Sequence, residues 1–379
     1  MTDQVATKQP SLRIASFGFR SFPPRAGSAG ADKFALELLT RLAARGHKVV
    51  GYNRAYPGEE VPPTHEYRGV EVHTLKTFRK SGAEAFWHSA KVTWDIIRHN
   101  RADVVHMQNG GNSLFGAILR LFGKKSFLTE DGKEWERSKW SGLAKLYMTT
   151  MTTLTARVHN EVLFDNVFVR KEFEDRYNKK YAFVPYGADV AYDPASETIL
   201  EELGLKKGEY FLFVGRFIPD KGLHYLVPAF ERLKTDKKLV LIGGSPVPTE
   251  YEQQIKSTTD PRIMMPGYVY GGGTHALMRN CFAYVQASDL EGLSPVILES
   301  AFLGAPIICS DIEMNRYVLE EHGIYFKQSD TGDLLAQMEH AIADPAWLRE
   351  HGAAQQAHVR DTYSWDRVVD THVEIFRQS

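Results

Sequence analysis

The feature that most limits the fold of this chain is a double alternation of short apolar strands with amphipathic helical segments. The first alternation begins with a predicted strand at 12–17 and a predicted helix at 31–45, closed by Gly46 at the C-cap position. Further strands are predicted at 47–52, 70–75, 103–107, 126–129 and 161–164. A second alternation runs from residue 210 to about residue 344. Strands that alternate with helices form largely parallel sheets covered on both faces, so the sequence predicts two doubly wound α/β domains.

The length of 379 residues exceeds what one hydrophobic core usually supports, which also favours two domains. We expect an N-terminal Rossmann-like domain at 1–190 and a C-terminal one at 209–360. The stretch 191–208, which is loosely charged and contains Asp-Pro, is the expected linker. The segment 361–379 is amphipathic at helical spacing and is expected to form a terminal helix.

Composition favours a cytoplasmic protein. Hydrophobic content of 43% and charged content of 25% are ordinary for a globular chain. The polar first eleven residues do not have the pattern of a signal peptide, and no uncharged apolar run approaches a membrane span. Cys281 and Cys309 lie in or beside apolar strands without metal-ligand spacing, so we expect buried free thiols in a reducing compartment.

Charge is divided unevenly along the chain. Residues 1–190 contain 29 Lys and Arg against 20 Asp and Glu, a net of +9, while the remainder has 17 against 27, a net of −10. The overall charge of −1 and the lack of a recognised binding motif argue against nucleic acid as a partner.

Residues 289–299 carry two carboxylates, Glu291 and Glu299, on either side of a predicted strand-to-helix turn. Pro295 suits the first helical turn, so the backbone N–H groups of the three preceding residues are expected to converge at a helix N-terminus, where phosphate binds well. The two carboxylates would then serve a sugar hydroxyl and a ribose hydroxyl. The alternative is that Glu291 caps the helix and Glu299 is solvated. The three residues before Pro295, whose N–H groups are expected to converge, are Gly292, Leu293 and Ser294.

A second phosphate-binding pattern follows the apolar strand 210–214. Gly215 and Arg216 come directly after this strand, and Lys221 lies five residues further on. Arginine offers a fixed fork of donors and lysine a point charge, and ligands of open α/β sheets bind at the carboxyl ends of strands. The two patterns together predict a diphosphate site in the C-terminal domain.

With both patterns in place, the chain resembles the retaining, GT-B-fold glycosyltransferases of family GT4 over nearly its whole length. The segment 129–140, TEDGKEWERSKW, is similar to one found in bacterial rhamnosyltransferase-like members, which build cell-surface polysaccharides. The resemblance implies two Rossmann-like domains facing across a cleft, with the acceptor on the N-terminal domain. It also implies that the terminal helix crosses back to that domain.

In the N-terminal domain, Gly30 belongs to a Gly-rich loop that would let backbone approach the donor. His106, Asn109 and Glu134 are the candidates on the acceptor side. Many GT4 members have a histidine after the strand equivalent to 126–129, whereas this chain has Asp131 there. Asp131 would orient an acceptor hydroxyl or act as a weak base.

The resulting prediction is transfer of a hexose, rhamnose among the candidates, from a nucleotide diphosphate sugar to a glycan or lipid-linked acceptor, with retention of configuration. The nucleotide sugar is a co-substrate, and no cofactor is expected. The nucleotide base is expected near Gly267, Tyr268 and Val269. No D-x-D motif occurs, so no metal site is predicted. The alternatives are a GT-B-fold nucleotide-sugar epimerase and a non-catalytic sugar-binding protein.

Basic and aromatic residues between 79 and 98 raise the question of membrane contact at the inner face of the cytoplasmic membrane. They form an interfacial patch if the aromatic side chains face outward. The alternative is a solvated helix whose aromatic stripe faces the core. These residues are Arg79, Lys80, Phe86, Trp87, Lys91, Trp94 and Arg98.

Overall fold

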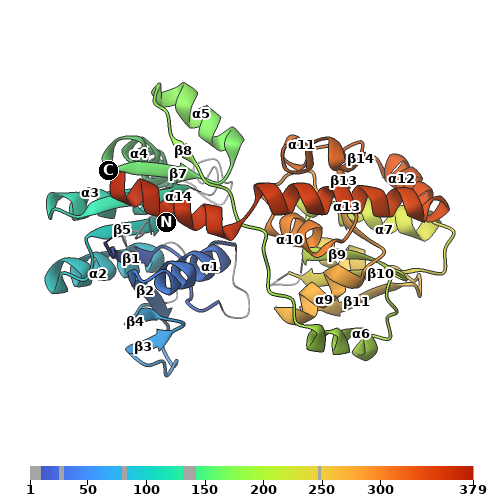
Figure 1. The fold of residues 1–379 in the computed structure, drawn as a ribbon, viewed down its shortest axis with the longest axis horizontal. Helices are drawn as coiled ribbons and strands as arrows, with labels where there is room; N and C mark the ends of the chain where they lie inside the picture. Colours follow the sequence, from blue (N-terminus) through green and yellow to red (C-terminus); the bar gives the residue numbers. More distant parts are fainter. Residues whose placement is uncertain (1–9, 25–29, 79–82, 131–141, 246–248, 379) are drawn as a thin grey trace, which may run out of the picture. The chain divides into compact units, whose positions relative to one another are not determined.

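The computed structural model describes residues 10–24, 30–78, 83–130, 142–245 and 249–378. The chain divides into two compact units. Unit 1 comprises residues 1–185 and 365–379, and unit 2 comprises residues 186–364. Each unit is built around a single sheet, and Figure 1 shows both with their elements labelled.

Unit 1 contains an eight-stranded sheet in the order β3-β4-β2-β1-β5-β6-β7-β8, parallel except for the β3–β4 hairpin. Its strands are β1 (Arg13–Phe17), β2 (Lys48–Ala55), β3 (Thr64–Tyr67), β4 (Val70–Lys76), β5 (Val104–Gln108), β6 (Lys125–Glu130), β7 (Glu161–Phe164) and β8 (Ala182–Phe183). Its helices are α1 (Gly30–Ala44), α2 (Ala83–His99), the 3-10 turn η1 (Gly110–Asn112), α3 (Ser113–Leu121), α4 (Gly142–Val158), α5 (Val167–Tyr177) and α14 (Trp365–Gln378).

The helices of unit 1 cover both faces of its sheet because side chains alternate along each strand. Val105 and Met107 of β5 belong to a core shared with α2, α3, α4 and α5. His106, between them, points to the opposite face, where α1 and α14 pack together. Figure 1 shows α1 and α14 running side by side.

Unit 2 contains a six-stranded, all-parallel sheet in the order β11-β10-β9-β12-β13-β14. Its strands are β9 (Tyr210–Arg216), β10 (Lys238–Gly244), β11 (Ile263–Gly267), β12 (Ala283–Gln286), β13 (Ile307–Ser310) and β14 (Ile324–Phe326). Its helices are η3 (Pro194–Glu197), α6 (Thr198–Glu202), η4 (Pro219–Lys221), α7 (Leu223–Arg232), α8 (Glu250–Lys256), α9 (Gly272–Asn280), α10 (Pro295–Leu303), α11 (Glu313–Leu319), η5 (Glu320–His322), α12 (Thr331–Ala343) and α13 (Pro345–Thr362).

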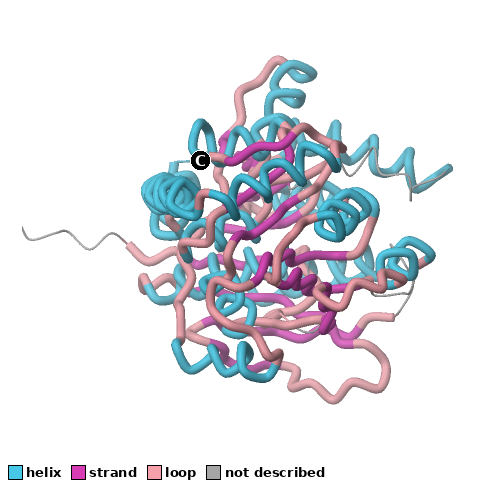
Figure 2. The backbone as a smooth tube through the Cα atoms, turned by 90° about the vertical axis from the view of Figure 1, so that its right-hand side faces the viewer, coloured by secondary structure: helices cyan, strands magenta, loops and turns pink. Residues whose placement is uncertain are grey.

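Aromatic and aliphatic side chains dominate the core of unit 2. Phe211 and Phe213 of β9 pack with α7 and α12 on one face. Tyr210, with the opposite orientation, donates a hydrogen bond of 2.7 Å to the Leu277 carbonyl of α9 on the other face. Figure 2, turned by 90° from Figure 1, shows strands (magenta) lying between helices (cyan). None of the helices in the described part of the chain combines the length and apolar character of a membrane span.

The residues expected as a linker, 191–208, belong instead to unit 2. They form η3 and α6, and α6 packs against α9. Leu200 and Leu205 are buried there, which explains why this short stretch is ordered. The first unit ends at Pro185 rather than at residue 190, and the chain returns to it at Trp365 rather than at residue 361.

Short polar side chains fix several helix starts in unit 2. Asp330 accepts hydrogen bonds from the N–H groups of Gly332 and Asp333 at the start of α12. Asp344 does the same for Ala346 and Trp347 at the start of α13. These caps satisfy backbone donors that have no partner inside the helix, so they set where the helices begin.

Candidate functional site

The strand order of unit 2 places a crevice at the carboxyl ends of β9 and β12. The chain proceeds from β9 outward through β10 to β11, then returns to β12 on the other side of β9. This reversal is the topological switch point at which open parallel sheets bind ligands. Both patterns singled out from the sequence lie in the loops that follow these two strands.

A glycine brings the two loops into contact. Gly222 has φ +67°, and a Cβ atom there would lie 1.8 Å from the carbonyl oxygen of Ala287. Only a residue without a side chain fits this approach. The Asp289 N–H then donates a hydrogen bond of 2.9 Å to the Asp220 carbonyl, so the loop after β9 is held against the loop after β12.

Lys221 and Glu291 form the central ion pair of this contact. The Lys221 Nζ lies 2.6 Å from Glu291 Oε1 and 2.7 Å from Oε2, and the Ser288 hydroxyl donates to Oε1 at 2.7 Å. The two side chains are 20% and 8% exposed. Because Glu291 receives these three contacts, its carboxylate has a fixed position, and it in turn fixes the ammonium group of Lys221 at the edge of the crevice.

Arg216 supplies a second positive charge at this edge. Its side chain is exposed and makes no hydrogen bond or ion pair with the other residues that the structure describes. Burial raises the pKa of Tyr268, and the nearby Arg216 charge opposes that rise. An unneutralised guanidinium at the carboxyl edge of a sheet is suited to an anionic ligand.

The N-terminus of α10 meets the same loop. Ser294 is its N-cap, but the Ser294 side chain does not cap the helix, and Pro295 occupies the first turn. Within the described residues, the N–H groups of Gly292, Leu293 and Ser294 donate to no backbone carbonyl. These donors and the helix dipole together favour a phosphate. Since Ser294 is the N-cap, Glu291 does not have the capping role that the alternative interpretation gave it.

Glu299 is buried rather than solvated. It lies within α10 and is 5% exposed, and its Oε2 is 3.5 Å from Nε2 of His275 in α9. A buried carboxylate beside an imidazole is too costly to be incidental, because desolvation of the charge must be offset by partners. Its placement in the first turns of α10 is compatible with binding a hydroxyl-bearing ligand.

A hollow of about 290 Å³ adjoins the crevice at the ends of β10 and β11. It is formed where Gly243 packs against β9 so closely that a Cβ atom would lie 1.9 Å from the Gly215 carbonyl oxygen. Tyr268 is 47% exposed at its wall and stacks in parallel on Tyr270, while the Val269 carbonyl accepts a hydrogen bond from Thr274. Its lining residues are Gly243, Gly244, Ser245, Glu252, Gln253, Lys256, Gly267 and Tyr268.

In unit 1, His106 does not have the exposure that acceptor binding needs. Its side chain is fully buried and hydrogen-bonds to Ser16 at 3.1 Å and to Thr129 at 2.8 Å. Burial lowers its pKa well below the usual value, so the ring is neutral. The ring also packs on Phe34 and His372. His106 is therefore a core residue, and its assignment to the acceptor was wrong.

Asn109, the other acceptor-side candidate among the described residues, lies in the loop after β5. Asn109 has φ +74°, and its side chain accepts a hydrogen bond from the Gly111 N–H at 3.0 Å. Positive φ is uncommon outside glycine and often marks functional loops. Gly30 is the exposed first residue of α1. Asp131 and Glu134 lie outside the described residues.

Two buried polar residues that were given no role from the sequence also lie at this edge of unit 1. Gln108 ends β5 and is 4% exposed, and its amide makes no hydrogen bond with the residues that the structure describes. Glu130 ends β6, is 2% exposed, and lies directly beside Gly110. Their positions at the ends of adjacent parallel strands were the available signal, because such ends meet at one edge of the sheet.

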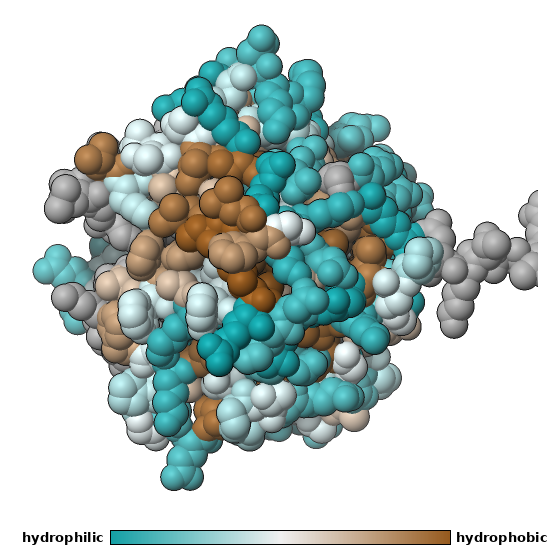
Figure 3. Space-filling model, turned by 90° about the vertical axis from the view of Figure 1, so that its left-hand side faces the viewer, coloured by the Kyte–Doolittle hydropathy of each residue, from teal (hydrophilic) through white to brown (hydrophobic). Residues whose placement is uncertain are grey.

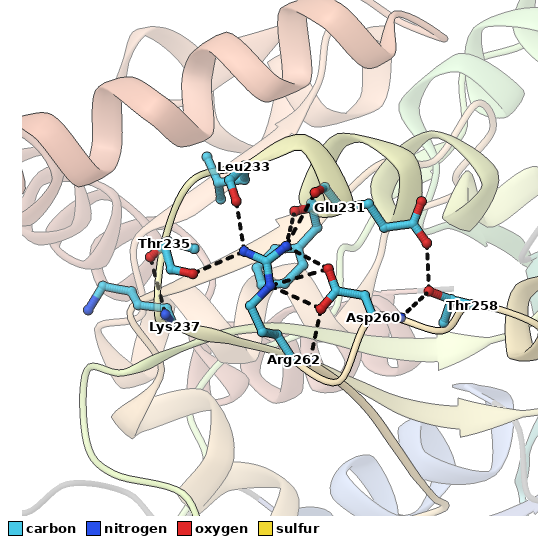
Figure 4. Close-up of polar contacts among 8 residues, drawn as sticks. Glu231, Leu233, Thr235, Lys237, Thr258, Asp260 and Arg262 are labelled. Atoms are coloured by element: carbon cyan, nitrogen blue, oxygen red, sulfur yellow. Dashed lines mark hydrogen bonds and ion pairs between the residues drawn. The ribbon is translucent and has the colours of Figure 1, made fainter.

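A charged cluster at the amino ends of the unit 2 strands has a different role (Figure 4). Arg262 pairs with Asp260 at 2.5 Å and donates to the carbonyls of Leu233 at 2.7 Å and Thr235 at 3.0 Å. Its guanidinium also lies 5.0 Å from the ring centroid of Phe230. The acceptors of these bonds are backbone carbonyls and the Asp260 carboxylate. The cluster therefore stabilises the loop before β10, and the Arg262 charge is not available to a ligand.

Residues 28–191 match the family described as Glycosyltransferase Family 4, and residues 195–358 match the family described as Glycosyl transferases group 1. The chain belongs to glycosyltransferase family 4. Together the two matches span nearly all of both units, and they include every residue of the Lys221–Glu291 contact. The protein is accordingly a glycosyltransferase.

The relatives of this glycosyltransferase include enzymes of surface-polysaccharide synthesis. It is 28% identical over 290 residues to D-rhamnosyltransferase WbpZ of Pseudomonas aeruginosa, covering 75% of this chain and 69% of the relative. It is 23% identical over 247 residues to the O-antigen chain mannosyltransferase C of Escherichia coli, covering 63% and 66%.

Solved structures confirm the GT-B fold of this glycosyltransferase. Sucrose-phosphate synthase of Thermosynechococcus elongatus superposes with a TM-score of 0.78 at 19% identity, covering 96% of this chain and 98% of that one. HepE of Anabaena, in complex with UDP and glucose, superposes with a TM-score of 0.76 at 14% identity, with the same coverage.

Proposed function

We propose that this glycosyltransferase moves a hexose or deoxyhexose from a nucleotide diphosphate sugar to a hydroxyl of a glycan or lipid-linked acceptor, with retention of anomeric configuration. The observation that carries the proposal is the convergence of Lys221, Arg216 and the amino end of α10 at the switch point of unit 2. Such a set of donors fits the diphosphate leaving group, whose charge grows as the glycosidic bond breaks.

Each residue of the crevice has a role in this proposal. Arg216 and Lys221 neutralise the leaving diphosphate, with the amides of residues 292–294, and so supply positive charge without a metal. Glu291 positions the transferred sugar, and Glu299 holds the ribose. The hollow beside Tyr268 takes the nucleotide base, because an exposed aromatic ring and glycine backbone suit a flat ring system.

Retention follows if the acceptor hydroxyl attacks on the face from which the diphosphate leaves. The C1–O bond to the β-phosphate breaks, a bond forms from C1 to the acceptor oxygen, and the acceptor proton passes to an oxygen of the departing phosphate. Asp131 orients the acceptor hydroxyl in this scheme, and Asn109 and Glu134 contribute to the acceptor side.

Two observations support the choice of substrates and compartment. The relatives named for rhamnosyl and mannosyl transfer support a hexose or deoxyhexose donor and a surface-polysaccharide acceptor. Cys281 and Cys309 are free buried thiols, which suits the cytoplasm, where nucleotide sugars would meet acceptors presented at the inner membrane face.

The test begins with thermal unfolding in the presence of UDP-, GDP-, ADP- and dTDP-sugars. A ligand that binds only the folded state at 100 times its Kd adds about 2.7 kcal/mol of stability, so the donor is identified by the largest rise in midpoint. The donor is then incubated with and without acceptor in the presence of EDTA, and the product anomer is assigned by NMR.

We expect acceptor-dependent release of the nucleotide diphosphate and a product with the donor's configuration. Conversion of the donor to another sugar without acceptor would identify an epimerase. Binding without turnover under any acceptor would identify a sugar-binding protein. An inverted product would contradict the proposed geometry of attack.

A further inference from the structure

Helix α2 buries Val92 and Ile96 in the core of unit 1 but leaves its two tryptophans largely outside that core. It buries His88, Ser89 and Thr93 against unit 1, while Trp87 and Trp94 are 48% and 61% exposed. Tryptophan normally gains stability from burial, and polar side chains lose hydration when buried. The aromatic stripe expected as a core-facing alternative therefore faces outward, and its exposure needs a reason outside the fold of unit 1.

The exposed apolar surface continues across two neighbouring helices. Leu121 is 85% exposed at the end of α3, Phe122 follows at 59%, and Leu146 of α4 is 63% exposed. Helix α3 packs against both α2 and α4. We call this surface the apolar face. It comprises Phe86, Trp87, Trp94, Leu121, Phe122 and Leu146.

Ring contacts of Phe86 join α2 to the two neighbouring helices. The ring of Phe86 in α2 lies 5.2 Å from that of Phe115 in α3 and 6.1 Å from that of Tyr147 in α4. Figure 3 views the side on which α2, α3 and α4 lie in Figure 1, and it shows hydrophobic residues gathered in one area. A gathered apolar surface of this kind is typical of a docking site, whereas single exposed apolar residues are ordinary.

The charges around the apolar face are positive. Lys91 and Arg98 alternate with Trp87 and Trp94 at helical spacing, so all four share one stripe of α2, and the Lys91 ammonium lies 5.8 Å from the Trp87 ring centroid. Arg120 and Lys124 flank Leu121 and Phe122, and Arg120 is exposed while Lys124 is half-buried.

The acidic side chains of α2 are paired toward the protein. Glu84 faces Arg54 at 3.8 Å, and Asp95 accepts a hydrogen bond of 2.8 Å from Tyr52 and pairs with Arg101 at 3.2 Å. Helix α3 contains no acidic residue, and neither does α4. Among the described residues of these three helices, the solvent side therefore combines aromatic rings, aliphatic side chains and basic groups, while the acidic side chains of α2 are paired.

We propose that the apolar face is the docking surface for an anionic lipid bilayer. Leu121 and Phe122 enter the acyl region, Trp87 and Trp94 lie at the headgroup boundary, and Lys91 and Arg98 contact lipid phosphates. An anionic bilayer is the partner that these side chains fit best. Tryptophan prefers the membrane interface, and long Lys and Arg side chains can reach anionic headgroups with their charged ends. A second copy of the chain would bring the same positive charges together, which disfavours self-association. The proposal is independent of the sugar-transfer reaction.

The test is co-sedimentation of the whole protein with vesicles of phosphatidylethanolamine and phosphatidylglycerol, compared with pure phosphatidylcholine vesicles. We expect binding to the anionic vesicles that weakens as salt is raised from 50 to 500 mM, because lipid charge is screened. The double variant Leu121→Ser and Phe122→Ser should bind at least about tenfold more weakly, since two apolar side chains no longer enter the bilayer. Tyr317→Ser, which removes an exposed aromatic ring from unit 2, should bind normally.

Charge reversal on the same face gives an independent measure. Lys91→Glu with Arg98→Glu should reduce affinity for anionic vesicles by about tenfold or more, whereas Lys234→Glu, an exposed lysine of unit 2, should have little effect. Melting temperatures of all variants, with and without nucleotide diphosphate, establish that they are folded.

Three outcomes would overturn the proposal. One is equal binding to both vesicle types by the wild type, or none at all. Another is unchanged binding by the Leu121→Ser, Phe122→Ser variant. The third is a wild-type dimer in sedimentation velocity that this variant converts to monomer, which would make the apolar face a contact between copies of the chain.

Discussion

The two units share one architecture but differ in what they bury. Among the described residues, unit 1 buries 24 polar or charged side chains and unit 2 buries 10. Those of unit 1 are spread through its interior, as in the bonded set of Ser113, Thr155, His159 and Ser126. Most of those in unit 2 lie near the carboxyl ends of β12 and β13, among them Gln286, Ser288 and Glu299.

The difference separates two uses of buried polarity. In unit 2 an apolar core of phenylalanine, leucine and isoleucine supplies stability, so polar groups are confined to the edge where a ligand would bind. In unit 1 polar groups are part of the packing itself, and each must keep its partners to avoid an uncompensated desolvation cost. Unit 1 should therefore be the more sensitive to solvent conditions, and unit 2 to loss of catalytic charge.

Acid should affect unit 1 most strongly. Burial lowers the pKa of His88 and His159 to about 3 and that of His372 to about 4. Above pH 6.5 these rings are neutral in both states, but below it the unfolded chain binds protons that the folded chain does not. Well below pH 6.5, the free energy of unfolding should fall by about 1.4 kcal/mol per histidine per pH unit, or about 4 kcal/mol per unit for these three, and the buried His106 acts in the same direction.

Urea unfolding at pH 7, 6 and 5, with hydrogen exchange to localise the loss, measures this effect. Exchange should rise in unit 1 before unit 2, and His159→Asn should reduce the pH slope, while the exposed His99→Gln should not. A slope that is the same in all three proteins would show that buried neutral histidines do not set the acid sensitivity.

Removal of one ring from α14 should also destabilise unit 1. Phe376 is 1% exposed and its ring lies 4.8 Å from that of Phe127 and 6.0 Å from that of His106. Phe376→Ala should cost about 3–5 kcal/mol, because a large cavity forms beside β5 and β6. Denaturant unfolding measures the loss. Glu374→Ala, which removes an exposed side chain of the same helix, serves as the control, and an equal loss in both variants would show that the ring contacts are not the cause.

Loss of charge in unit 2 should affect turnover instead of stability. Arg216→Ala should reduce kcat by about 10²-fold, or about 2.7 kcal/mol, because the guanidinium stabilises charge that grows in the transition state. Its melting temperature should stay near that of the wild type, since Arg216 is exposed. Arg232→Ala provides an exposed arginine control in the same unit. Near-normal turnover in Arg216→Ala would refute the proposal that Arg216 stabilises the leaving diphosphate.

The smallest expected effects separate the two glutamates. Glu299→Ala should weaken binding of the free nucleotide diphosphate by about tenfold, because its proposed partner is the ribose, which does not react. Glu291→Gln should change that affinity less and reduce kcat more. Calorimetry with the nucleotide that stabilises the protein best decides between them, and the reverse pattern would exchange the two roles.

The sequence predicted the regular parts of both units because their patterns are local. The strands at 161–164 and 210–216, for example, have apolar runs that only a buried strand explains. It predicted the strand at 70–75 but missed β3 at residues 64–67, which pairs with that strand in a hairpin and is weakly patterned because it consists mainly of polar residues. It also treated residues 191–208 as a linker, because the buried Leu200 and Leu205 are too few to give a recognisable helical period.

At the candidate sites, sequence spacing identified residues but not their partners. The pairing of Lys221 with Glu291 depends on Gly222 touching Ala287, a contact across 65 positions that no local pattern contains. His106 was misassigned for the related reason that a strand-end histidine gives no sign of which face it occupies. Only the packing of α14 at the far end of the chain makes that face a core.

The return of α14 to unit 1 determines the order in which the protein can be completed during synthesis. The ribosome makes residues 10–185 before the whole of unit 2, and Trp365 to Gln378 after it. Until α14 emerges, Phe34, His106 and Phe127 lack the helix that covers them. Unit 2, though later in the sequence, has a continuous chain and reaches its full set of contacts earlier. The nascent N-terminal part therefore leaves these side chains uncovered while unit 2 is synthesised, and α14 covers them only after unit 2 is complete.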